Sequence, residues 1–176
     1  MNKKNPRVTN NSNQANGFTL IEVLIALVVL SLGILGVAGL QVKAQQFNRS
    51  AYLNTQATII AHDMMERMRA NPAALTASTP SYHLPNADKH DTCYTLAGCS
   101  AQEMAENDMY EWAGSTSDGV LSTLPGGSAV VCLDGTPDDG SPSDSACDGT
   151  GNIYVVKVWW QNKDSDLQRV VTTVAF

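Results

Sequence analysis

A single carboxylate interrupts the most apolar part of the chain. Between Phe18 and Leu40 the only charged residue is Glu22. On insertion scales, a charged residue at the centre of a membrane helix costs about 2.5 to 3.5 kcal/mol. Glu22 lies near the start of the run, however, where the dipole of a helix favours negative charge. Considered alone, Glu22 is either tolerated near a membrane interface or kept for a function.

Four cysteines, Cys93, Cys99, Cys132 and Cys147, could form disulfides or hold a metal. All of them follow the apolar run, so we expect them in an oxidising compartment. An even count in an exported domain favours pairing, although four cysteines allow three connectivities. Zinc is the main alternative, but the chain has no C-x-x-C pair. We choose Cys93–Cys99 and Cys132–Cys147, because each bridge would close a local loop that contains glycine.

No other group of residues has the spacing of an active site. His62, His83 and His90 are dispersed, and the chain has no H-x-x-x-H pair, glycine-rich phosphate loop or Gly-x-Ser-x-Gly elbow. We therefore expect neither enzymatic activity nor a cofactor.

The segment 134–152 is rich in aspartate and suggests calcium binding. An EF-hand loop that began at Asp144 would place Ala146 at its third position and Val155 where a bidentate glutamate is required. The template therefore fails. We interpret the segment as a solvated acidic loop and expect no metal, while a less regular calcium loop stays open as the alternative.

The apolar run has the length of a membrane span, for which about 20 residues are needed. Lys3, Lys4 and Arg7 precede it without any acid, so the N-terminus should be cytoplasmic and the chain after the run should lie outside. A secretory signal peptide would be shorter and would end at an A-x-A-like site. Here the residues after Leu40 continue into more helix-forming sequence, so cleavage on that side is not expected.

We expect one helix from Phe18 to Ala70, because no proline occurs within it. It would be roughly 80 Å long, so only its first half, 18–40, can be in lipid. The second half, 41–70, carries one apolar stripe at helical spacing, formed by Ala57, Ile60, Ala61, Met64 and Met68. This stripe should pack on a water-soluble domain.

The domain 71–176 combines a short helix with strands. Ala101–Ala113 can form the helix, and Leu124-Pro125-Gly126-Gly127 is typical of a turn. The strand candidates are Ala129–Leu133, Ile153–Trp160 and Gln168–Phe176. The polar residues between the last two favour a hairpin. The fold class is therefore α+β, with the long helix packed on a small antiparallel sheet.

The charge of the chain is unevenly distributed. The net charge is −6, and because the first 17 residues are basic, the remainder is more acidic still. An acidic domain repels nucleic-acid phosphates. We therefore expect no nucleic acid among its partners.

The segment Gly17-Phe18-Thr19-Leu20-Ile21-Glu22-Val23-Leu24 resembles the type IV prepilin signal. Members of the type IV pilin-like family share a basic leader that ends in glycine, followed by a helix that opens with Phe and has Glu at its fifth position. The match covers the leader, residues 1–17, and the first helix. It is highly specific.

This resemblance implies a processing step and an assembly contact. A prepilin peptidase would cut between Gly17 and Phe18 and methylate the new amino terminus of Phe18. Glycine suits the cut, because it brings no side-chain clash when a protease holds extended backbone close to its catalytic groups. Glu22 would pair with the Phe18 amino group of a neighbouring subunit during assembly.

Within the family, several segments resemble the minor pilins called type IV pilus modification proteins. They are Met64–Pro72, Trp112, Leu124–Gly127 and Trp159-Trp160. This likeness implies a minor pilin that takes part in initiation of pilus assembly near the tip. Its partners would be the prepilin peptidase, other minor pilins and the major pilin, with a large tip adhesin as a further candidate. It would move from the inner membrane to the surface pilus.

Two other functions share the same signal and architecture. One is a minor pseudopilin of a type II secretion system. The other is a tip adhesin or DNA-uptake subunit, for which surface residues of the C-terminal domain would matter most.

Overall fold

The computed structural model describes residues 17–77, 79–113, 119–162 and 166–175. The chain divides into two units, residues 1–46 and 47–176. The long helix α1, Leu20–Ala70, contributes residues to both. Hydropathy placed the end of the membrane segment at Leu40, whereas the structural division by contacts falls after Gln46. These criteria measure different properties, so the membrane boundary stays a prediction.

The first unit is a solvent-exposed apolar helix in its described part. Every described residue from Gly17 to Gln45 is exposed. The helix contains a window long and apolar enough to cross a membrane, and none of that window is buried. An exposed helix of this composition fits an inner-membrane anchor.

The second unit contains the remaining elements: α2 (Pro72–Leu75), a 3₁₀ turn η1 (Asp91–Tyr94), α3 (Ala101–Ala113), a 3₁₀ turn η2 (Val120–Thr123), β1 (Ser128–Leu133), β2 (Ile153–Gln161) and β3 (Leu167–Ala175). The strands form one antiparallel sheet in the order β1-β2-β3. The expected α+β fold is therefore confirmed. The expected hairpin is the β2–β3 pair, whose register runs from Ile153↔Ala175 to Gln161↔Leu167.

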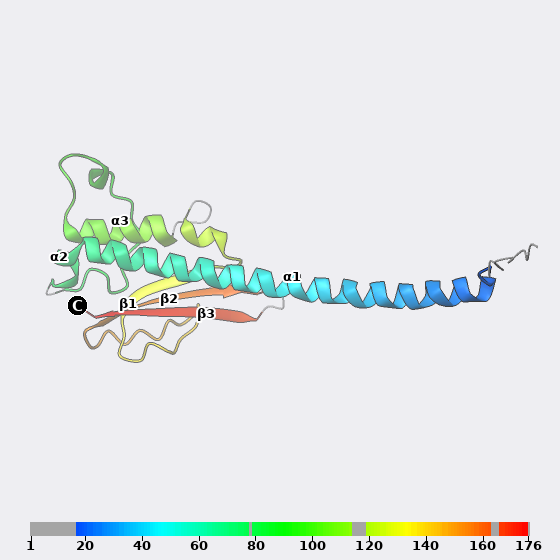
Figure 1. Cartoon of the computed structure of the whole chain (residues 1–176). Helices are drawn as coiled ribbons and strands as arrows, with labels where there is room; N and C mark the ends of the chain where they lie inside the picture. The colour runs from blue at the N-terminus through cyan, green and yellow to red at the C-terminus, as the bar shows by residue number, and fades with distance from the viewer. Residues whose placement is uncertain (1–16, 78, 114–118, 163–165, 176) are drawn as a thin grey trace, which may run out of the picture. The chain divides into compact units, whose positions relative to one another are not determined.

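The core lies between α1 and the inner face of the sheet. All five residues of the expected apolar stripe are buried, together with Leu53 and Met65. Opposite them, alternate residues of β2 point inward and are buried: Tyr154, Val156, Val158 and Trp160. Figure 1 shows α3 and the sheet on different sides of this part of α1. The apolar side chains that recur every 3.6 residues on the helix therefore pack against those that recur every second residue on the strand, in one apolar layer.

The outer face of the sheet is covered as well. Val155, Lys157 and Trp159 point away from α1, yet each is almost completely buried. The segment 134–152 lies on this face, where it supplies oxygen atoms to Lys157. The expectation of a simply solvated acidic loop is therefore wrong for Asp134, which is 0% exposed. A strand buried on both faces explains why the β2 sequence is apolar without clear alternation.

The irregular segment between α2 and α3 protects the free edge of β1. The Leu84 N–H donates to the Val131 carbonyl over 3.0 Å, and the Leu133 N–H donates to His83 Nδ1 over 3.1 Å. These bonds occupy backbone groups that an edge strand would otherwise expose. The sequence predicted α3 with its observed bounds, but it did not predict α2 or the two 3₁₀ turns.

We predict that Ile60→Asp unfolds the C-terminal unit, because Ile60 is 1% exposed and an unpaired carboxylate would enter the core. Its neighbour Ile59 is 55% exposed, so Ile59→Asp is a matched control that should leave the fold intact. Limited proteolysis of the full chain in detergent measures both. Equal protease resistance of the two variants would contradict the packing of α1 on the sheet.

Candidate functional site

Helix α1 begins at a threonine cap, Thr19. The Thr19 carbonyl accepts hydrogen bonds from the N–H groups of Glu22 and Val23, over 3.1 and 3.3 Å. The Thr19 hydroxyl oxygen lies 3.4 Å from the Glu22 nitrogen. Thr at the cap with Glu three residues later is a pattern that can be read from sequence, and it places the first helical residue at Leu20. Sequence reasoning missed it and began the helix at Phe18.

Phe18 and Glu22 lie on one side of the chain. Together with Val23, Ala26, Leu27 and Leu30 they line a shallow apolar groove along α1. Glu22 therefore lies in the first turn of α1, where the helix dipole favours a negative charge, and beside Phe18, the expected new N-terminus.

No close contact within the described chain requires a glycine at position 17. A Cβ atom added at Gly17 would meet no atom within 4 Å, and the same holds for Gly33, Gly36 and Gly39. By contrast, Gly127 is required by the fold, since its Cβ would lie 2.6 Å from the Leu121 carbonyl oxygen. The described fold would thus accept a side chain at position 17, so it does not explain the glycine of the Gly17-Phe18 junction.

Arg67 fastens α1 to α3. Its guanidinium donates to Asp63 on its own helix over 3.1 Å, and to Asp108 and Glu111 of α3 over 3.3 and 2.7 Å. Partial burial lowers the pKa of Arg67, but the hydrogen bonds to Glu111 and Asp63 outweigh it and raise that pKa above its ordinary value. The group is therefore a permanent cation between two helices.

A second set of bonds continues from Asp108. The buried Tyr82 hydroxyl donates to Asp108 Oδ2 over 2.5 Å, and Asn71 Nδ2 donates to the Ala101 carbonyl over 2.8 Å. Burial, followed by the bond to Asp108, raises the pKa of Tyr82. The fold therefore explains Arg67 and Asn71 in the segment Met64–Pro72, because these two residues position α3 and the loop that precedes it.

The other segments that resemble minor pilins also have structural reasons. The indole Nε1 of Trp112 donates to the Ile60 carbonyl over 2.8 Å. Gly126 has a φ of +60°, and the Pro125 carbonyl accepts from Gln161 N over 2.8 Å. Trp160 belongs to the core, whereas Trp159 is buried on the outer face of the sheet. These residues specify the fold of the unit, and they do not by themselves identify a partner.

The structure joins Cys93 to Cys99 and Cys132 to Cys147, which are the two pairs chosen from the sequence. The first bridge has a sequence separation of 6 and closes a loop that begins within η1. The second spans 15 residues and ties the buried strand β1 to the far end of the acidic loop. Because Cys132 and Cys147 are bonded to each other, their sulfur atoms are not free thiolates for a metal beside Asp134.

The three histidines do not converge. His90 Nε2 lies 2.7 Å from Glu106 Oε2, His83 accepts the β1 edge bond, and His62 is exposed on α1. Among the described residues they form no common cluster with a nucleophile. The arrangement gives no basis for assigning a catalytic reaction.

Two family models match adjacent parts of the chain. The prokaryotic N-terminal methylation motif matches residues 12–38, and the model described as type IV pilin Tt1218 matches residues 39–110. Neither covers residues 111–176, which contain the sheet and the acidic loop. No significant match was found to a curated protein or to a solved structure.

We predict that removing the Cys132–Cys147 bond destabilises the C-terminal unit more than removing Cys93–Cys99. Closing a loop of about 15 residues is worth roughly 3 kcal/mol in the chain-entropy model, and a shorter loop is worth less. Chemical unfolding of Cys132→Ser/Cys147→Ser and of Cys93→Ser/Cys99→Ser, each as full chain in detergent, measures the difference. Non-reducing peptide mapping of the unchanged protein checks the pairs, and a peptide linking one pair to the other would overturn them.

Proposed function

Because the chain belongs to the type IV pilin-like family, we propose that it is a minor pilin that takes part in initiation of type IV pilus assembly near the pilus tip. The observation that carries the proposal is the Gly17-Phe18 junction, with Glu22 four residues later, directly before an apolar helix. The methylation-motif match includes this junction. The family is structural rather than enzymatic, which agrees with the absence of a recognisable catalytic motif in the sequence.

The proposed route begins in the inner membrane. Residues 1–17 form the cytoplasmic leader, residues 18–40 span the membrane, residues 41–70 continue the helix outside, and residues 71–176 complete the periplasmic domain. The prepilin peptidase removes the leader after Gly17 and methylates the Phe18 amino group. The lack of any contact in the described chain that requires glycine at position 17 supports this step, since a protease that holds extended backbone close to its catalytic groups favours glycine.

Glu22 then provides the charge that selects a neighbour. In lipid its carboxylate is unfavourable, and a neighbouring subunit's Phe18 amino group would neutralise it. The groove shared by Phe18 and Glu22 supports this pairing, because both groups are accessible on one side of the helix. Extraction from the membrane exchanges lipid contacts of the helix for contacts with like helices.

The finer assignment is to the minor pilin PilV, the type IV pilus modification protein. It rests on the resemblance of Met64–Pro72, Trp112, Leu124–Gly127 and Trp159-Trp160. In this role the chain joins other minor pilins in a complex that primes polymerisation of the major pilin, with a large tip adhesin as a further partner.

Deletion of the gene tests the role against its alternatives. A priming subunit predicts few or no surface filaments in the deletion strain, and restoration by the intact chain. Normal filaments with failed export of folded proteins would overturn the proposal in favour of a type II secretion pseudopilin. Normal filaments with lost adhesion or DNA uptake would overturn it in favour of a tip receptor.

We predict that the mature chain begins at an N-methylated Phe18 and keeps the apolar segment. Mass spectrometry of the protein from a strain with the peptidase measures this, and a peptidase-negative strain is the control. A mature N-terminus after Ala44, or an intact chain from Met1, would exclude the proposed processing.

We predict that Glu22→Ala and Glu22→Gln both enter the membrane normally and are both depleted from sheared pili. The Thr19 bonds use the backbone N–H of residue 22, and glutamine fits the same T-x-x-E/Q sequence pattern, so Glu22→Gln retains the helix start and loses only the charge. Immunoblots of membrane and sheared fractions measure the distribution. If Glu22→Gln were incorporated normally and only Glu22→Ala failed, residue 22 would act through the polar end of its side chain rather than through its charge, and the charge pairing would be wrong.

A further inference from the structure

Lys157 places a positive charge at the centre of the sheet. It is the only charged residue of β2, the middle strand, and its side chain is 0% exposed. An ammonium group without partners in such a place would be strongly unfavourable. Its partners come from one part of the acidic loop, residues 134–147, which starts where β1 ends and is closed by the Cys132–Cys147 bond.

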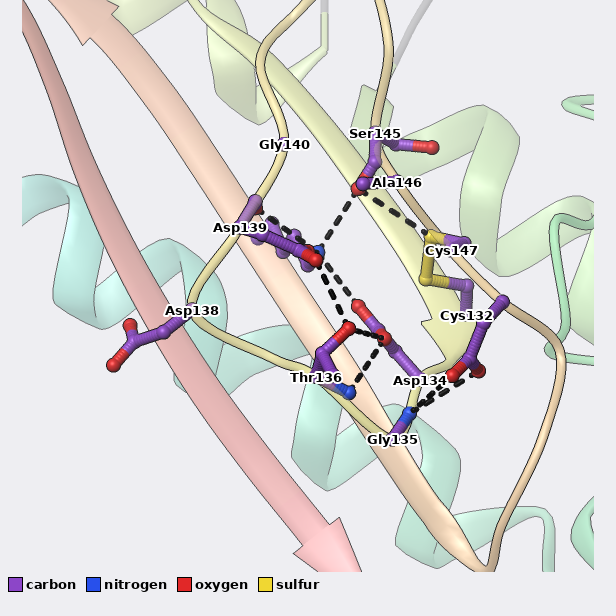
Figure 2. A network of polar contacts seen from close by, with 12 residues as sticks. Cys132, Asp134, Gly135, Thr136, Asp138, Asp139, Gly140, Ser145, Ala146 and Cys147 are labelled. Carbon is purple, nitrogen blue, oxygen red and sulfur yellow. Dashed lines mark hydrogen bonds and ion pairs between the residues drawn. A yellow bond between two sulfur atoms is a disulfide. The ribbon is translucent and has the colours of Figure 1, made fainter.

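Four oxygen atoms surround the ammonium. Lys157 Nζ lies 2.6 Å from Asp134 Oδ2 and 2.9 Å from Asp139 Oδ1. It also donates to the backbone carbonyls of Asp139 and Ser145, over 3.1 and 2.9 Å. Figure 2 shows Asp134, Asp139 and Ser145 gathered around one point beside the disulfide. Burial alone lowers the pKa of Lys157, but the bonds to Asp134 and Asp139 outweigh it and raise that pKa.

Other contacts hold the loop in the same conformation. Thr136 N donates to Asp134 Oδ1 over 2.9 Å, and the Thr136 hydroxyl donates to Asp139 Oδ2 over 2.9 Å. From β3, the Arg169 guanidinium donates to the carbonyls of Asp138 and Asp139 over 2.9 and 2.7 Å. The carboxylates and carbonyls are thus turned inward together, which is the arrangement that a bound cation stabilises.

We propose that this loop is a cation site whose resident cation is the chain's own Lys157 ammonium. Two carboxylates and two backbone carbonyls form part of a ligand set that suits a hard divalent ion, since calcium takes carboxylate and carbonyl oxygens and completes its roughly six to eight ligands with water. Lys157 reaches this set from β2 and fills it. The tethered charge is always present, so folding of the loop does not depend on the concentration of a free metal ion.

The native chain and a chain without the ammonium should respond differently to calcium. In the native chain the site is filled, so calcium should not stabilise the unit. In Lys157→Ala the oxygen atoms remain, the ammonium is gone and space is left for an ion. In Lys157→Met the charge is gone, but an apolar chain still occupies most of the space.

The experiment follows thermal unfolding of the full chain in detergent by near-ultraviolet circular dichroism, in EDTA and in millimolar CaCl₂. The native chain should give the same midpoint in both. Both variants should unfold roughly 10 °C or more lower in EDTA, since breaking a buried ion pair leaves charges without partners. The midpoint of Lys157→Ala should rise by roughly 4 °C for each tenfold excess of CaCl₂ over its dissociation constant, whereas Lys157→Met should not respond.

Lys89→Ala is the matched control, because Lys89 is an exposed lysine of the same unit that pairs with Asp91, and it should behave as the native chain does. A native midpoint that rises in CaCl₂ would overturn the proposal, because a metal would then bind beside or instead of Lys157. A Lys157→Ala chain that gains nothing from CaCl₂ would overturn it too. Should Lys157→Ala be unfolded in EDTA, recovery of its near-ultraviolet signal on adding CaCl₂ supports the proposal, and failure to recover contradicts it.

Discussion

The packing of α1 on the inner face of the sheet is the contact on which the C-terminal unit depends. A small sheet with an apolar face must bury that face against another element. The stripe from Leu53 to Met68 supplies that cover. Because Pro72 follows directly, the helix ends once the sheet is covered, and the chain can turn back. Helix α3 then packs beside α1 through Trp112 and Arg67.

The outer face of the sheet is covered by the acidic loop instead of by a helix. Lys157 sits in the middle strand with its charge directed to the outer face, so this face needs oxygen atoms around the ammonium, between the apolar Val155 and Trp159. Asp134 and Asp139 of the loop supply these oxygen atoms. The Cys132–Cys147 bond restricts the conformations of the loop in the unfolded chain, so that ordering the loop costs less entropy. The apolar layer and the polar layer are therefore linked through a single strand, β2.

The parts of the fold that could be predicted carry their signals locally. Helical spacing marked the stripe of α1, and β-branched residues on either side of a polar turn marked the β2–β3 hairpin. The Thr19-x-x-Glu22 sequence pattern was equally local and would have placed the helix start correctly. The site around Lys157 was different, because nothing near Asp134 in sequence reveals an ammonium supplied by a later strand. A lone lysine within an apolar strand was the available signal, and composition alone led to the wrong interpretation of Asp134 as solvated.

Some residues are required by the fold, and others are not. Arg67, Asn71, Trp112 and Gly127 each have a contact or a close approach that requires them. Gly17 has no such reason within the described chain, and Phe18 is exposed. A residue type that its own fold does not require must be selected by another molecule, if it is selected at all. For this junction we propose a peptidase and a neighbouring helix, since the first needs accessible backbone and the second would offer an amino group to a carboxylate in lipid.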